Sequence, residues 1–91
     1  MQNITRQYVN NEIARCYYLA INPECVSKSA YMARALRMWK ASEDVFSARA
    51  NHAQIERSKA ILGRDMRDAP CNALKCDGDT WSLIWRALSR A

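Results

Sequence analysis

The chain has 91 residues and a formal net charge of +5, with 14 lysines and arginines against nine acidic residues. This length fits one domain, and a composition of 49% hydrophobic and 25% charged residues excludes a wholly disordered chain. No apolar run approaches the roughly 18 residues that cross a bilayer, and the first residues lack the pattern of a signal peptide. We therefore expect one cytoplasmic domain, residues 1–91, without a membrane partner.

The composition favours helices. Only two glycines and two prolines occur, whereas alanine, arginine, leucine and methionine, which are strong helix formers, are frequent. Few turn-forming residues also argue against a domain built of many strands. We predict an all-α fold, a three-helix arrangement in which one long central helix is packed by shorter N- and C-terminal helices.

The first helix is predicted over residues 5–21. Thr5 is a good N-cap, and Asn22-Pro23 ends the helix because proline disfavours the α conformation in the residue before it. Apolar residues recur between these limits at spacings of four, three and four, which places them on one helix face. These residues are Val9, Ile13, Cys16 and Ala20.

The central helix is predicted over residues 29–62, with Ser27 or Ser29 as its N-cap and Gly63 as its C-cap. Its stripe alternates by three and four residues without interruption: Met38, Ala41, Val45, Ala48, His52, Ile55, Lys59 and Leu62. Such a helix is about 50 Å long, whereas a compact chain of this size is only about 30 Å across. A break at Ser42, a good N-cap, is the alternative. The unbroken periodicity favours one continuous helix.

Residues 63–79 are rich in turn formers and are predicted to be a connector, and the last helix is predicted over residues 80–90. The apolar face of that last helix contains Trp81, Ile84, Trp85 and Leu88. The three predicted helices therefore pack with the first and last along the central one.

The four cysteines do not predict a metal site. They are Cys16, Cys25, Cys71 and Cys76, and the spacings within the two pairs fit structural zinc poorly. Nothing in the sequence suggests secretion, where disulfides persist. We expect free thiols, no cofactor and no metal, with disulfides or a metal site as less favoured alternatives.

No group of residues predicts catalysis. His52 is the only histidine, no nucleophile lies near it in the sequence, and no glycine-rich phosphate loop occurs. The carboxylates fall on exposed helix positions or in the turn-rich connector. We therefore expect a chain that is not an enzyme.

The aromatic residues give the strongest functional signal, because three tryptophans, four tyrosines and one phenylalanine exceed what three unequal helices can bury. Tryptophan, tyrosine and arginine dominate the energetics of protein interfaces. The predicted protein-binding residues are Tyr31, Arg34, Arg37, Met38, Trp39 and Trp85. Ala69 and Pro70, in the connector, are a further candidate that a partner could recognise.

These features predict a small binding protein that docks on a larger protein or complex and modulates or inhibits it. Bacterial accessory factors and phage-encoded inhibitors of host machinery often have this shape, which is an association at the level of fold. The partner could be a nucleic-acid-processing enzyme, and self-association is a further option. The alternative is a regulator that binds nucleic acid directly through the basic face of the central helix, since residues 1–40 hold six basic and two acidic groups. A redox- or metal-responsive switch is a third and weaker hypothesis.

Overall fold

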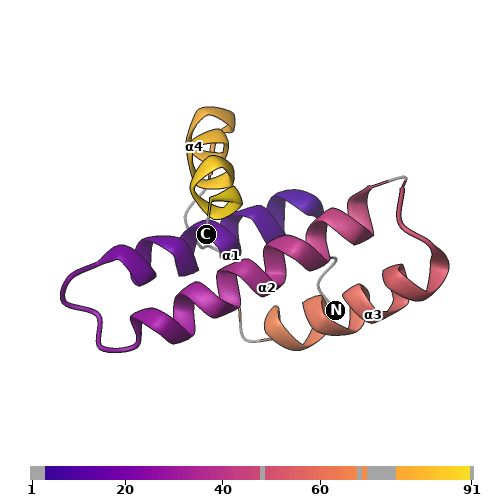
Figure 1. Cartoon of the computed structure of the whole chain (residues 1–91), viewed down its shortest axis with the longest axis horizontal. Coiled ribbons are helices and arrows are strands. Elements are labelled where there is room, and N and C mark those ends of the chain that lie inside the picture. The colour runs from indigo at the N-terminus through magenta and orange to yellow at the C-terminus, as the bar shows by residue number, and fades with distance from the viewer. Residues whose placement is uncertain (1–3, 48, 68, 70–75, 91) are drawn as a thin grey trace.

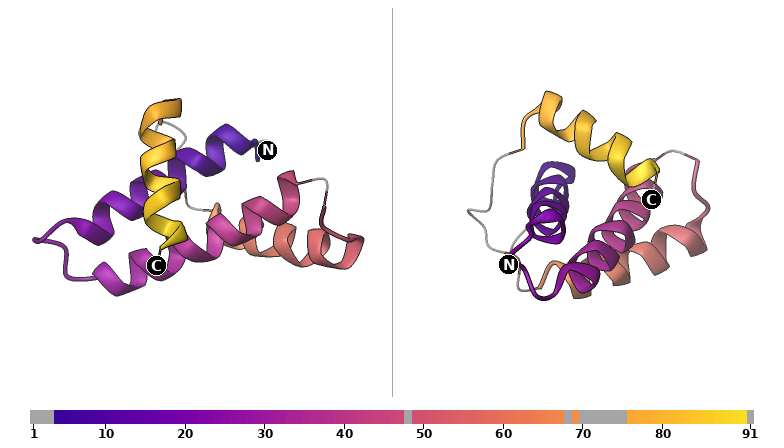
Figure 2. Two further views of the ribbon diagram at one scale, coloured as in Figure 1. Left: turned by 45° about the horizontal axis from the view of Figure 1, so that its top comes forward. Right: turned by 60° about the vertical axis from the view of Figure 1, so that its left-hand side comes forward.

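The computed structural model describes residues 4–47, 49–67, 69 and 76–90, and its regular elements over these residues are all α-helices. They are α1 (Arg6–Ile21), α2 (Lys28–Phe46), α3 (His52–Asp65) and α4 (Gly78–Ser89). Helices α1, α2 and α3 run back and forth, so that each lies antiparallel to the next (Figure 1). Helix α4 stands across α1, and its C-terminal end meets α2 (Figure 2). The all-α class is confirmed, but the described residues form four helices and not three.

Helix α1 begins and ends where the sequence predicts. The Thr5 side chain accepts a hydrogen bond from the backbone N–H of Tyr8 at 3.1 Å, and Asn22 is the C-cap. Val9, Ile13 and Cys16 have no exposed surface, so the predicted apolar stripe is the buried face. Full burial of a valine or isoleucine side chain, such as Val9 or Ile13, stabilises the fold by roughly 1.5–3 kcal/mol through removal from water.

The predicted continuous helix over residues 29–62 is wrong, because α2 ends at Phe46 and the chain reverses before α3 begins at His52. A straight rod of this length would measure about 50 Å, but the longest dimension of the molecule is 40 Å. By folding back, α3 packs on α2, which also packs on α1. Met38, Ala41 and Leu62 of the stripe are buried, whereas His52 and Lys59 are exposed. The alternative break, Ser42, is also wrong, since Ser42 is 3% exposed and lies inside α2.

Helix α3, which follows the observed break, has an N-cap of its own, Asn51. The Asn51 side chain accepts a hydrogen bond from Gln54 N at 2.9 Å, and the Gln54 side chain accepts one from Asn51 N at 3.0 Å. This reciprocal capping box satisfies two backbone donors that the first turn of α3 leaves open. At its other end α3 continues through Gly63 to Asp65, so the prediction of Gly63 as a C-cap is also wrong.

The last helix begins at Gly78, two residues before the predicted start. The Asp77 side chain is its N-cap and accepts a hydrogen bond from Thr80 N at 2.7 Å.

The core draws on all four helices and on the connector that precedes α4. Its fully or nearly buried apolar residues are Val9, Ile13, Ala14, Cys16, Ala35, Met38, Ala41, Leu62, Met66, Ala69, Cys76, Ile84 and Leu88.

Polar side chains of α1 hold the two described ends of the connector. The Tyr8 hydroxyl donates to the Ala69 carbonyl at 2.9 Å. Asn11 Oδ1 accepts from Cys76 N at 2.9 Å, and Gln7 Nε2 donates to Cys76 O at 3.1 Å. Because Cys76 lies two residues before α4, these bonds fix where α4 starts above α1.

Candidate functional site

A surface hollow of about 520 Å³ lies between α2 and the C-terminal end of α4. We call it the α2–α4 hollow. It is lined by Ala33, Leu36, Arg37, Trp39, Lys40, Leu88 and Ser89. The α2 residues recur at spacings of three and four, so they form one stripe along about two turns of that helix. Helix α4 stands crosswise to α2 (Figure 2), and Ala33, Arg37 and Lys40 of this stripe are exposed.

Two tryptophans meet beside the hollow. The ring centroids of Trp39 and Trp85 are 5.9 Å apart at an interplanar angle of 84°, an edge-to-face contact. Such a pair contributes roughly 0.5–1.5 kcal/mol beyond the apolar area it buries. Trp85 still exposes 43% of its surface. The indole N–H of Trp39 is buried and has no hydrogen-bond partner among the described residues.

Helix α4 carries more apolar surface than its neighbours cover. Ile84 and Leu88 face the core and are almost fully buried. Leu83, on the outer side of the same helix, is 66% exposed. Leu83 and Trp85 are two residues apart and therefore lie on different sides of α4, so of these two exposed side chains only Trp85 is beside the hollow.

The charged residues that line the α2–α4 hollow are both cations, Arg37 and Lys40. Lys40 is exposed and takes part in no ion pair among the described residues. Glu43, one turn further along α2, forms an ion pair with Arg6 of α1, with Oε1 of Glu43 4.0 Å from Nη2 of Arg6. No carboxylate is among the described residues that line the hollow.

Arg34 and Arg37 belong to the contact between α2 and α3. Arg37 holds both carboxylate oxygens of Asp65, with Nε to Oδ2 at 2.9 Å and Nη2 to Oδ1 at 3.1 Å. Arg34 donates to the backbone carbonyl of the same residue. Asp65 is only 7% exposed, and its hydrogen bond raises the pKa of Arg37 above the ordinary arginine value. Arg34 is thus committed to an internal contact, whereas Arg37 both pairs with Asp65 and lines the hollow.

The other sequence-predicted site residues that the structure describes are buried or half-buried. Met38 is completely buried, so its side chain belongs to the core of the folded chain. Tyr31 is half-buried against the core. Ala69 is 7% exposed with its carbonyl held by Tyr8, and Pro70 lies outside the described residues. Of the predicted residues, the structure brings Arg37, Trp39 and Trp85 together at the α2–α4 hollow.

Sequence reasoning did not assign Leu36, Lys40 or Leu88 to the site. The spacing of Ala33, Leu36 and Lys40 by three and four places them on one side of α2 and is a signal that could have grouped them. Leu88 joins them only through the tertiary position of α4.

A buried acid and thiol lie elsewhere, on the inner face of α1. Glu12 has no exposed surface, and its Oε1 accepts from Arg15 Nε at 2.8 Å and from the Cys16 thiol at 3.4 Å. Burial raises the pKa of Cys16 to about 12, and the Glu12 carboxylate adds to the rise. A raised pKa favours the protonated thiol at neutral pH, and a protonated thiol is a poor nucleophile.

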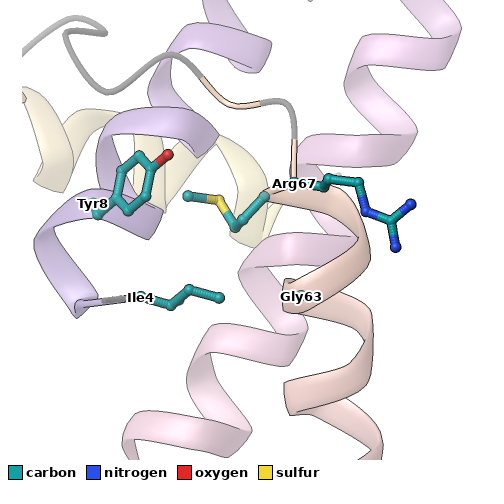
Figure 3. Close-up of a pocket in the computed structure, with 5 residues that line it drawn as sticks. Ile4, Tyr8, Gly63 and Arg67 are labelled. Carbon is teal, nitrogen blue, oxygen red and sulfur yellow. The ribbon is translucent and has the colours of Figure 1, made fainter. Parts of the chain in front are cut away.

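A second pocket, of about 300 Å³, lies between the start of α1 and the end of α3 and is lined by Ile4, Tyr8, Gly63, Met66 and Arg67. The guanidinium of Arg67 points away from Ile4 and Tyr8 (Figure 3). The Tyr8 hydroxyl, at the edge of this pocket, is bonded to the Ala69 carbonyl, and the described lining residues bring no second polar side chain toward it.

The described residues contain no cluster of three or more histidine, cysteine or acidic side chains arranged to hold a metal. Cys16, Cys25 and Cys76 are free thiols, and Cys71 lies outside the described part of the chain. No helix among the described residues has the length and hydropathy needed to span a membrane. Comparisons of the chain with protein-family models, curated proteins and solved structures find no match. The α2–α4 hollow is therefore the best-supported candidate site.

Proposed function

We propose that this chain is a non-enzymatic cytoplasmic binding protein that docks on a larger protein through the α2–α4 hollow and modulates or inhibits it. The observation that carries the proposal is that three features coincide: an open, largely apolar hollow, the half-exposed Trp85, and Lys40, which forms no ion pair with any described residue. Hot spots of protein interfaces combine an aromatic anchor with a polar rim. Here Trp85 would be the anchor and Lys40 would belong to the rim.

Direct binding of nucleic acid is the less favoured alternative. It relies on a row of free cations along the central helix. Arg34 and Arg37 are both engaged by Asp65, and the long helix that would carry the row is divided between α2 and α3. A phosphate backbone is neutralised best by several free cations in line, because binding rises with the number of phosphates contacted.

The test is to fill the hollow without disturbing the core. Ala33 lines the hollow and is exposed, so Ala33→Trp adds a large ring there and removes no buried contact. Ala60 is an exposed alanine in the middle of α3, and Ala60→Trp is the matched control.

Tagged wild type should recover a stoichiometric protein partner from nuclease-treated extract of the source cells at moderate salt. Ala33→Trp should lose that partner, and Ala60→Trp should keep it. Recovery of nucleic acid alone, or a partner that both variants retain equally, would overturn the proposal.

A second measurement addresses the anchor. Trp85→Ala should weaken binding of the recovered partner by about 2 kcal/mol or more, as expected for a central aromatic contact. Because Trp85 also packs on Trp39, circular dichroism and thermal melting are measured in parallel. A change in melting alone, with affinity unaltered, would place Trp85 in the fold and outside the interface.

A further inference from the structure

We infer that the occupant of the α2–α4 hollow is an acidic amphipathic segment of the partner, about two helical turns long, with apolar anchors and flanking carboxylates. This inference rests on the proposed function and specifies the chemistry of its partner.

The length of the occupant follows from the lining of the hollow. The stripe on α2 runs from Ala33 to Lys40, which corresponds to about 10 Å along the helix axis. Leu36, Trp39 and Leu88 supply apolar walls over this distance. A segment of about two turns presents apolar side chains at i and i+3 or i+4 across that span, as in other cases of a helix bound in a groove.

The charge of the occupant follows from the charges around the hollow. Lys40 and Arg37 line it, and Arg86 is exposed on α4 immediately after Trp85. Neither Lys40 nor Arg86 has an ion-pair partner among the described residues. Asp65 already neutralises much of the charge of Arg37. The positive charge that remains in the lining is that of Lys40, which attracts carboxylates and repels a basic segment. The exposed Arg86 adds to the positive charge of α4 but is not a lining residue.

The same charges argue against a second copy of the chain as the occupant. Each copy carries a net charge of +5, and the described surface around the hollow offers no carboxylate lining that could meet Lys40 of another copy. An isologous dimer would bring the two hollows, and their cations, together. Like charges at an interface are unfavourable.

The experiment uses a displayed library of random 12-residue peptides, selected for binding to the whole chain. Binders that also bind Ala33→Trp are removed, so that the remaining peptides depend on the hollow. We expect these peptides to be enriched in aspartate and glutamate and to contain apolar residues three or four apart. Their affinity should fall as the salt concentration rises, because exposed charges are screened.

A charge reversal within the site supplies the second arm. Lys40→Glu should lower the affinity for the selected peptides by about tenfold or more, since it replaces attraction by repulsion at the rim of the hollow. Lys28→Glu is the matched control, because Lys28 is an exposed lysine at the first turn of the same helix, about 18 Å from Lys40 along the axis. The control should leave affinity unchanged.

Failure of this inference is distinguishable from failure of the proposed function. Hollow-dependent peptides that are neutral or basic, or that tolerate Lys40→Glu, would overturn the acidic occupant and leave the protein-binding role standing. Concentration-dependent dimerisation in sedimentation, abolished by Ala33→Trp, would identify a second copy as the occupant and also overturn it. A library that yields no hollow-dependent peptide would count against both the occupant and the docking surface.

Discussion

Helix α2 meets α3 and α4 in different ways. The contact with α3 is directional, because Asp65 is held by two arginines of α2 and Asp44 accepts a hydrogen bond from Ser58 at 2.9 Å. The contact with α4 depends on apolar packing and on one pair of tryptophan rings. Hydrogen bonds to a buried carboxylate fix one geometry, whereas apolar contacts depend mainly on the area covered.

This difference explains where apolar surface remains exposed. Polar contacts hold α3 alongside α2 over much of its length (Figure 1). Helix α4 crosses instead, so it covers only part of the α2 stripe and leaves the hollow beside Trp85. The proposed docking surface therefore lies at the less specified of the two contacts.

The largest effect is expected from removing equivalent leucines at the two contacts. Leu62 of α3 and Leu88 of α4 are each 1% exposed. Leu62→Ala should lower the free energy of global unfolding by about 3 kcal/mol through the cavity it leaves. In Leu88→Ala we expect a similar loss of packing to appear first as faster amide exchange confined to α4, because few contacts tie that helix to the rest.

Urea denaturation and native-state hydrogen exchange measure the two effects. If Leu88→Ala accelerates exchange in α2 and α3 as strongly as in α4, the four helices form one cooperative unit and the contrast between the two contacts does not extend to stability.

The next effect is expected at Asp65. Asp65→Asn removes the negative charge and leaves Arg37 without its ion-pair partner. Loss of one partner of a fully buried pair costs about 3–5 kcal/mol, and because the Arg37 side chain is 40% exposed we expect about 2 kcal/mol. Glu56→Gln is the control, since the Glu56–Lys59 pair at 3.7 Å is more than half exposed. It should change stability by less than about 0.5 kcal/mol. Equal effects in denaturant titrations would show that the Asp65 contact adds no more than a surface pair.

Some parts of the fold could be predicted from the sequence, and others could not. Helix α1 could be predicted because its cap and its apolar stripe are both local. The break after Phe46 was missed because the three-four spacing of apolar residues continues from one helix to the next. Spacing alone does not distinguish a straight helix from two that fold back with their stripes facing each other. His52 belonged to the predicted stripe, yet it is exposed at the first turn of α3.

A local signal for the break was nevertheless present. Asn51 followed by Gln54 three residues later is the pattern of a capping box, and the structure forms both of its hydrogen bonds. A helix of about 50 Å is also longer than the roughly 30 Å diameter of a compact chain of this size, which favours a break. Together these two observations outweigh the periodicity.

The candidate site could be predicted only in part. Trp39 and Trp85 are recognisable as interface residues by type, but their contact depends on the crosswise position of α4. That position is fixed by bonds such as the one between Asn11 and Cys76, which are 65 residues apart in sequence. Met38, which is grouped with Trp39 by sequence, is buried for a simpler reason. It lies about 100° around the helix from its neighbour Trp39, and that rotation turns it into the core.

A smaller effect is expected at the N-cap of α3. Asn51→Ala removes the side-chain acceptor of the capping box and should destabilise the chain by about 1 kcal/mol in denaturant titrations. Asn51→Asp, which retains the acceptor, should lose much less. Equal losses in the two variants would mean that the side-chain oxygen does not carry the stabilisation.

The smallest expected effect is a difference in pH dependence between the two caps. The backbone N–H of Thr80 donates to the Asp77 carboxylate and lowers the pKa of Asp77 below the ordinary aspartate value. A lowered pKa in the folded state means that the cap stabilises α4 above the ordinary aspartate pKa. This contribution is lost as pH falls through the lowered value, where the carboxylate takes up a proton. Asn51 has no such titration, so the cap of α3 should persist in acid. In an NMR titration the Thr80 amide shift should move with a midpoint below that of an unperturbed aspartate, while the Gln54 amide shows no matching transition. A Thr80 midpoint at the ordinary aspartate value would mean that Asp77 gives α4 no charge-assisted cap.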